Sequence, residues 1–157
     1  GPNMTRCFED YITLSYQVLE MLRTERIFER EGIQGEIDAY NPLIPDGTNW
    51  KVTLLVEFPD PIERREALEK RIGVEDRCWV RVGDMERVFA IADEDMEREN
   101  DEKTSAVHFL RFELSPSMIA ATKSGASLSI GVDHENYRHM VSPLPAAVRD
   151  SLSGDLG

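Results

Sequence analysis

The chain is poor in basic residues and has no long apolar run. Its 157 residues include 18 Lys and Arg against 30 Asp and Glu, which gives a formal net charge of −12 at pH 7. No block of Lys or Arg stands apart from neighbouring acids, whereas nucleic acids and anionic membranes bind concentrated cationic faces. The composition therefore argues against nucleic acid and membrane surfaces as partners.

Segments that would direct the chain into or across a membrane are also missing. No apolar stretch approaches the roughly 20 residues of a membrane-spanning helix, and no charged-then-apolar leader precedes the first expected helix. We therefore expect a soluble, cytoplasmic protein. The initial Gly-Pro-Asn is typical of a remnant of tag cleavage, so a single domain is expected over residues 4–157.

Cysteine is scarce as well. Cys7 and Cys78 form neither a CxxC pair nor a metal-spaced cluster, so a disulfide framework or structural zinc is not expected. Cys78 opens an apolar strand and is expected to be a small buried hydrophobic residue. Because GxSxG, a papain-like cysteine setting and a glycine-rich phosphate loop are all absent, hydrolase and nucleotide-binding functions have no supporting motif.

What the sequence does contain is a regular hydrophobic pattern. It predicts a first helix from Glu9 to Arg30, ending before Gly32, and further helices at 33–40, 61–72, within 115–125 and near the C-terminus. The predicted strands are 50–58, 78–82, 86–92, 106–114 and 126–132. Since two strands form a hairpin beside helices, we expect an α+β fold: an antiparallel or mixed sheet of about five strands packed against a long N-terminal helix and shorter helices.

An acidic run, DEDMERENDEKTS, occupies residues 93–105. It lacks the glycine and the terminal Glu of a calcium-binding loop. It would bind Ca²⁺ only if its acids curled into a cage, so we expect a solvated loop or a frayed helix.

Glu25 is unusual because the expected first helix would place it within an apolar stripe. At about 100° per residue it falls about 20° from Val18, whereas Glu20 lies nearly opposite. An isolated buried carboxylate is costly. Glu25 is therefore expected to be covered and paired, and Glu20 to be solvated.

The predicted strands carry charged side chains that could pair with Glu25. With a period of two, His108 lies on the apolar face of its strand, and Arg111 and Glu113 lie on the other face. Four charged residues occupy the less apolar strand faces: Glu57, Arg81, Arg111 and Glu113. Because arginine and carboxylate pair through two parallel hydrogen bonds, we predict that Glu25 meets an arginine.

Two interpretations of this charged row remain open. One is a structural ion network. The other is a polar pocket between the first helix and the sheet, in which iron, manganese or zinc would be bound. Its metal ligands would be Glu25, Glu57, His108 and His134. The ExxH spacing of a di-iron bundle is absent, and His108 and His134 can also be a core and a surface histidine.

The pocket leads to the hypothesis of a metal-dependent or redox accessory protein. Glu25, Glu57 and Arg111 would perform the chemistry, and His108 would be a ligand or proton shuttle. Arg81 and Glu113 would contact the cofactor. The alternative is a non-catalytic binding or assembly module whose acidic surface docks a redox partner protein. A homodimer is the default oligomeric state.

Five stretches are familiar together: EMLRTERIFEREGI, AYNPLIPDGTN, EFPDP, ADEDMERENDEKTSAVHFLRFEL and DHENYRH. From about Phe8 to Tyr137 the chain resembles the bacterial family labelled domain of unknown function 3501. That family is functionally uncharacterised, so the resemblance assigns no catalytic residue. It implies redox or metal biology only by association, since its members are encoded beside rubrerythrin-like and iron–sulfur proteins. Members carry a basic segment ahead of Phe8, so a less covered first helix is expected here.

Overall fold

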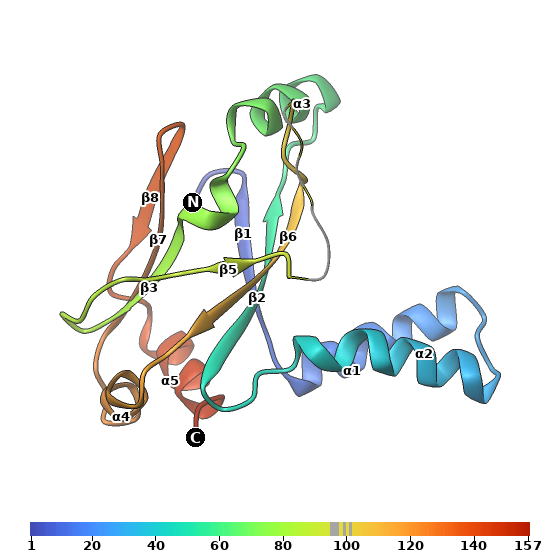
Figure 1. Ribbon diagram of the computed structural model, residues 1–157, viewed down its shortest axis with the longest axis horizontal. Coiled ribbons are helices and arrows are strands. Elements are labelled where there is room, and N and C mark those ends of the chain that lie inside the picture. Colours follow the sequence, from blue (N-terminus) through green and yellow to red (C-terminus); the bar gives the residue numbers. More distant parts are fainter. Residues whose placement is uncertain (95–97, 99, 101) are drawn as a thin grey trace.

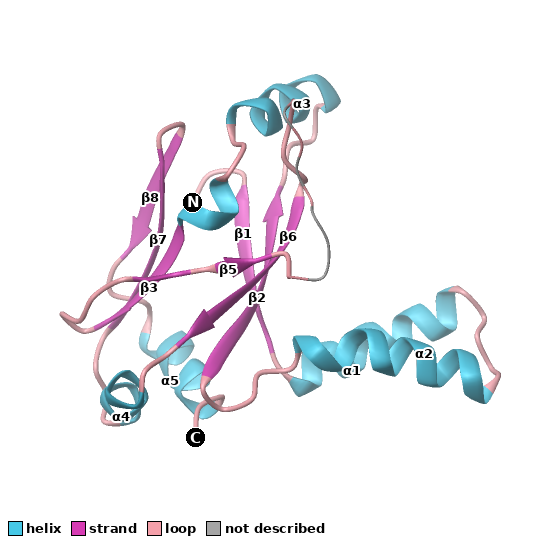
Figure 2. Cartoon of the chain, viewed as in Figure 1, coloured by secondary structure: helices cyan, strands magenta, loops and turns pink. Residues whose placement is uncertain are grey.

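The computed structural model describes residues 1–94, 98, 100 and 102–157. In this part of the chain, strands form two antiparallel sheets of four, with helices around them (Figures 1 and 2). Sheet A has the order β1-β2-β6-β5 and consists of β1 (Met4–Glu9), β2 (Asn49–Val56), β6 (Val107–Glu113) and β5 (Ile91–Ala92). Sheet B has the order β4-β3-β7-β8 and consists of β4 (Val88–Phe89), β3 (Cys78–Val82), β7 (Leu128–His134) and β8 (Tyr137–Val141).

Five helices accompany the sheets in the described part of the chain. They are α1 (Tyr11–Thr24), α2 (Arg30–Tyr40), α3 (Pro61–Lys70), α4 (Pro116–Lys123) and α5 (Ala146–Gly154), with 3-10 turns η1 (Asn41–Leu43) and η2 (Val74–Arg77). Side-chain caps begin three of the helices, α1, α3 and α4. Asp60 and Ser115 accept backbone hydrogen bonds at the starts of α3 and α4, and proline follows each of them. Gly125, with φ of 93°, follows α4.

The core lies between the two sheets. Along β2 the alternate residues Trp50, Val52, Leu54 and Val56 are buried, as the period of two requires. They share one hydrophobic cluster with Val80 of β3, Phe112 of β6 and Leu128 of β7.

The shortest connection between the two sheets runs from β4 to β5. Only Ala90 separates β4 at the edge of sheet B from β5 at the edge of sheet A. The Ala90 N–H donates to the Cys78 carbonyl at 2.9 Å, while Asp93, directly after β5, donates its N–H to the Phe109 carbonyl at 2.8 Å. This crossing brings the end of β5 against β6.

Helices α1 and α2 form a hairpin that projects to one side of the sheets (Figures 1 and 2). Within α1, Leu14 is the buried residue. Large apolar side chains of the same helix are exposed, among them Ile12 at 74% and Tyr16 at 65%. The hairpin therefore covers little of either sheet.

The predicted α+β class and the antiparallel pairing are confirmed, but two details are wrong. The strands form two sheets rather than one of about five strands: the predicted strand 86–92 is divided at Ala90 into β4 of sheet B and β5 of sheet A. Two further strands, β1 and β8, lie at sheet edges where the sequence predicts none. The long N-terminal helix is shorter than expected: it runs from Tyr11 to Thr24, not from Glu9 to Arg30. Short edge strands of mixed polarity leave a weak periodic signal.

Among the described residues, each helix falls short of the length and apolar character needed to span a bilayer.

Candidate functional site

Glu25 is not buried, although its expected position in the first helix predicted that it would be. It is the C-terminal cap of α1, and its side chain is exposed. The prediction that Glu25 is buried and paired with an arginine is therefore wrong. The predicted apolar stripe continues past Thr24, where the helix ends, and α1 packs against α2. Glu20 pairs with Arg23 at 2.8 Å on the surface.

The charged residues of β6 do meet, but on the outer face of sheet A. Arg111 donates to Glu94 from Nε and Nη2 at 2.9 and 2.7 Å, and to Glu113 from Nη1 at 2.5 Å. These hydrogen bonds raise the pKa of Arg111 and lower the pKa of Glu94 from their ordinary values. Asn49 also donates to Glu113 at 2.8 Å. The row is thus a partly exposed ion network.

The remaining predicted residues are scattered. Glu57 follows β2, is exposed, and accepts from Thr5 at 2.9 Å. Arg81 is half-buried in β3, on the other sheet. His134 is buried, and its Nε2 donates to the Ile72 carbonyl at 2.8 Å while its Nδ1 accepts from the Asn136 N–H at 3.1 Å. Both of its ring nitrogens are therefore occupied, and the expected pocket of Glu25, Glu57 and His134 does not form.

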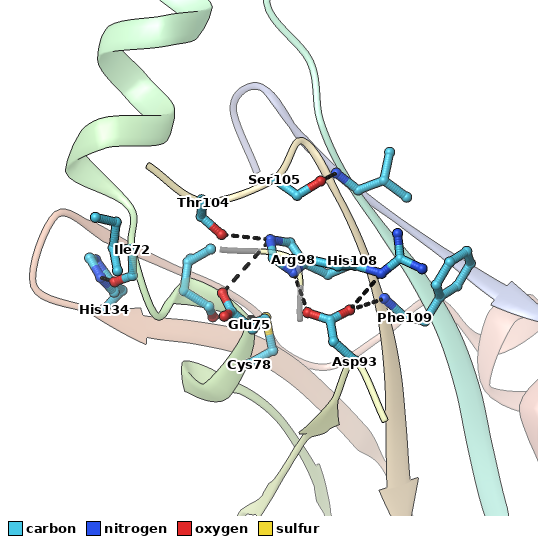
Figure 3. A network of polar contacts seen from close by, with 12 residues as sticks. Ile72, Glu75, Cys78, Asp93, Arg98, Thr104, Ser105, His108, Phe109 and His134 are labelled. Atoms are coloured by element: carbon cyan, nitrogen blue, oxygen red, sulfur yellow. Dashed lines mark hydrogen bonds and ion pairs between the residues drawn. The ribbon is translucent and has the colours of Figure 1, made fainter. Parts of the chain in front are cut away.

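His108 instead lies in a different buried group (Figure 3). It points from β6 into the space between the sheets and has no exposed surface. Three other side chains converge on it: Glu75 from η2, Asp93 from the end of β5, and Thr104 from the segment before β6. All of them are at most 9% exposed.

The imidazole of His108 is held on both sides. Its Nδ1 lies 2.5 Å from Asp93 Oδ2, and its Nε2 lies 2.8 Å from Thr104 Oγ1. A carboxylate only accepts, so Nδ1 carries a proton; in the neutral ring Nε2 then accepts from the threonine hydroxyl. Glu75 Oε2 is 3.8 Å from the same Nε2. The ring is therefore fixed with Nε2 turned toward Thr104 and Glu75.

Asp93 is itself positioned by strand pairing. Its Oδ1 accepts the Phe109 N–H at 2.9 Å, and its backbone has a φ of 50°, which is uncommon for a residue other than glycine. Arg98 Nε lies 3.4 Å from the same Oδ1, and its guanidinium is 4.7 Å from the centre of the Phe109 ring. Backbone and side-chain contacts thus hold the carboxylate against His108.

The group could bind a cation. Glu75, Asp93 and His108 offer one ligand atom each, and these atoms all lie within 4.8 Å of one another. Carboxylate oxygen together with imidazole nitrogen suits iron, manganese or zinc. A histidine that ligates a metal commonly donates its other ring N–H to a carboxylate, which is the relation of His108 to Asp93.

Sequence reasoning found His108 but missed its partners. Asp93 and Thr104 were assigned to the solvated acidic run 93–105, of which residues 95–97, 99 and 101 lie outside the described part of the chain. Glu75 lies in a 3-10 turn without periodicity. Asp93 directly follows the alternating residues 86–92, and Thr104 shortly precedes β6. Their positions next to predicted strands are the only indication in the sequence that they lie near the sheet.

Comparison with known proteins identifies the family of the chain and a protein of similar fold, both of unknown function. The chain is similar to a solved structure from Burkholderia pseudomallei, described as a novel protein of unknown function: the two are 51% identical, with a TM-score of 0.93 over 100% of this chain and 81% of that one. No curated protein matches. Residues 1–156 match the family described as protein of unknown function DUF3501, and the chain belongs to that family.

Proposed function

We propose that the chain is a metal-associated accessory protein and that its metal site is the group Glu75, Asp93 and His108. The observation that supports this is the convergence of three ligand side chains, from η2, from the residue after β5 and from β6, with ligand atoms within 4.8 Å of one another. Iron, manganese and zinc are the metals that such a donor set suits. A redox role follows if the metal is iron or manganese, because zinc has no redox chemistry.

Each residue has a distinct part in this proposal. Nε2 of His108 and Oε2 of Glu75, 3.8 Å apart, would be direct ligands. Asp93 would hold Nδ1 and so orient the ring, or add a carboxylate oxygen. The Thr104 hydroxyl, which donates to Nε2, would have to give way to the metal. Glu25, Glu57 and His134 lie elsewhere and have no part in it.

Metal analysis of protein purified without chelator tests the proposal. We expect stoichiometric iron, manganese or zinc in the wild type, and its loss in Glu75→Gln and His108→Gln. His134→Gln is the matched control, because His134 is also buried and hydrogen-bonded at both nitrogens. Metal retained equally in all variants would reject the site.

A second measurement covers the case in which His108→Gln does not fold. Wild-type protein is titrated with Zn²⁺, Mn²⁺ or Fe²⁺, and thermal unfolding is followed. A ligand that binds the native state raises the unfolding temperature in proportion to its affinity and concentration. If none of the three ions shifts the transition, the group is a structural hydrogen-bond network and the metal proposal fails.

The exposed apolar side of α1 favours a second function, that of a binding module for a redox partner protein. Between α1 and the outer face of sheet A lies a groove of about 600 Å³, and its lining includes Ile12, Tyr16, Leu55 and Phe109. Exposed apolar patches of this kind mark protein contacts. The family resemblance suggests a rubrerythrin-like partner.

Sedimentation of mixtures with a rubrerythrin-like protein tests this second function. Tyr16→Asp is expected to abolish the complex, because it places a charge in the groove. Ile62→Asp is the control, since Ile62 is 70% exposed on α3, away from the groove. A complex that survives Tyr16→Asp, or none with the wild type, would contradict the binding-module function.

A further inference from the structure

Three arginines gather on the outer side of sheet B, although the chain is strongly acidic. Arg77 comes from η2, Arg87 from the turn before β4, and Arg138 from β8. All three surround Asp133 of β7: the closest distances to its carboxylate oxygens are 3.6 Å for Arg77, 3.8 Å for Arg87 and 3.3 Å for Arg138. Arg77 also donates from Nε to the Asp133 backbone carbonyl at 2.8 Å. Three elements thus bring their positive charges to one point.

The carboxylate does not neutralise this group. Arginine stays protonated at all ordinary pH values, so three guanidinium groups and one carboxylate leave an excess of two positive charges. The distances to the Asp133 carboxylate exceed the roughly 2.7–2.9 Å of a charge-assisted hydrogen bond. Among the residues that the structure describes, Arg87 and Arg138 donate no hydrogen bond at all, so their N–H groups remain available to a ligand.

Aromatic rings hold two of these guanidinium groups in place. Arg87 lies 4.1 Å from the centre of the Trp79 ring, and Arg77 lies 5.2 Å from that of Phe89. Stacking restricts a flexible side chain before any ligand arrives. Gly131 lets the indole lie against the strand, because a Cβ there would be 2.4 Å from Trp79 Cζ2.

A groove lies beside Asp133 and two of these arginines, Arg87 and Arg138. The groove, of about 370 Å³, is lined by Trp79, Arg87, Asp133, Arg138 and His139, among others. This volume falls within the range of roughly 300–1,000 Å³ that is usual for small-molecule sites. The acidic remainder of the chain would repel an extended polyanion such as nucleic acid. A compact ligand fits both observations.

We propose that this groove binds an oxyanion, a phosphoryl or carboxylate group of a small molecule. Planar guanidinium groups match the oxygen spacing of both. Arg87 and Arg138 line the groove, and the ligand oxygens accept from their N–H groups. Arg77 does not line it and contributes its positive charge from its position beside Asp133. The site involves none of Glu75, Asp93 and His108 and does not depend on a metal.

Isothermal titration of the full chain at constant ionic strength tests the proposal, with pyrophosphate in one arm and citrate in the other. Saturable binding of either anion is expected, and the tighter arm identifies the phosphoryl or the carboxylate group. Arg138→Gln and Arg87→Gln should each weaken binding about tenfold, as the loss of a charge-assisted hydrogen bond implies. Changes in tryptophan fluorescence report the same site, because Trp79 lines the groove whereas Trp50, the other tryptophan, lies in the core.

Arg65→Gln is the matched control. The Arg65 side chain is 73% exposed, against 74% for Arg138, and it pairs with Glu69 on α3. We expect its anion affinity to equal that of the wild type. Because Arg138 is so exposed, its replacement should leave thermal unfolding unchanged. Absence of saturable binding in both arms, or equal affinity in wild type and the double variant Arg87→Gln/Arg138→Gln, would overturn the proposal.

Discussion

The two faces of β6 carry opposite kinds of polar arrangement. On the inner face, His108 has no exposed surface, and Asp93 and Thr104 bind its two nitrogens. On the outer face, Arg111 bridges Glu94 and Glu113, whose side chains are 51% and 39% exposed. Asp93 and Glu94 are adjacent in sequence, yet Asp93 belongs to the buried network and Glu94 to the solvent-exposed one.

This difference in exposure affects stability, because water can replace a lost hydrogen-bond partner on the outer face of β6 but not on the inner face. A solvated ion pair gains little over its separate hydrated ions, typically up to about 1 kcal/mol. A buried polar group that loses its partner keeps the full cost of desolvation. Substitutions on the two faces of β6 should therefore differ in size even where the number of lost contacts is similar.

The largest difference is expected for the two phenylalanines of β6. Phe112→Ala empties a fully buried position on the inner face and should lower the free energy of unfolding by about 3–5 kcal/mol. Phe109→Ala, on the half-buried outer face, should cost less than about 2 kcal/mol. Urea denaturation of both variants measures this. Equal losses would show that the outer face is covered in solution.

The buried network should respond next most strongly. Asp93→Ala removes the acceptor of both His108 Nδ1 and the Phe109 N–H, and we expect a loss of about 3 kcal/mol. Asp150→Ala, on the surface of α5, is the control and should change stability by about 0.5 kcal/mol or less. Chemical unfolding at pH 7 compares them. A small effect of Asp93→Ala would mean that water reaches His108.

The outer network should respond weakly and with a defined pH dependence. Arg111→Gln should cost about 0.5–1 kcal/mol at pH 7. Since Arg111 lowers the pKa of Glu94 from its ordinary 4.5, this stabilisation is present above that value and is lost as the pH falls through the lowered pKa.

Unfolding midpoints of wild type and Arg111→Gln at pH 7 and at about pH 3 test that sign. The gap between them should narrow at the lower pH, and at pH 7 it should also narrow in high salt. A gap that widens on acidification would contradict the assigned pairing.

The smallest effect is expected at Glu25. Because its side chain is exposed at the end of α1, Glu25→Ala should change the free energy of unfolding by about 0.5 kcal/mol or less. Glu20→Ala, which removes the surface pair with Arg23, should have an effect of similar size. A loss of several kcal/mol in Glu25→Ala alone would mean that the hairpin is covered in solution.

Prediction from sequence was accurate where one element determines the outcome. The alternation in residues 106–114 placed His108 on the buried face and Arg111 and Glu113 on the other. The proline and capping residues located α3 and α4 to within a few residues. These signals act between residues that are close in the chain.

The candidate site was predicted only in part, because its residues come from separate elements. His108 was expected to be a ligand or a core histidine, and the structure leaves both compatible with its position. Asp93 reaches it only because β5 pairs with β6. Within the acidic run nothing local distinguishes Asp93 from Glu94, which faces Arg111 instead. For Glu25, the rotation of about 100° per residue along the expected helix predicted burial, but the helix ends before this residue.

By itself, the sequence determined the α+β class, the antiparallel hairpin and the side of β6 on which each residue lies, because side-chain alternation and end caps depend on near neighbours in the chain. The tertiary structure alone decided which acids are enclosed. Burial depends on the surface that lies opposite, and here that surface comes from distant segments: the packing of η2 against β5 and of β5 against β6 encloses Glu75 and Asp93, whereas α1 packs against α2 and Glu25, just past its end, stays in water.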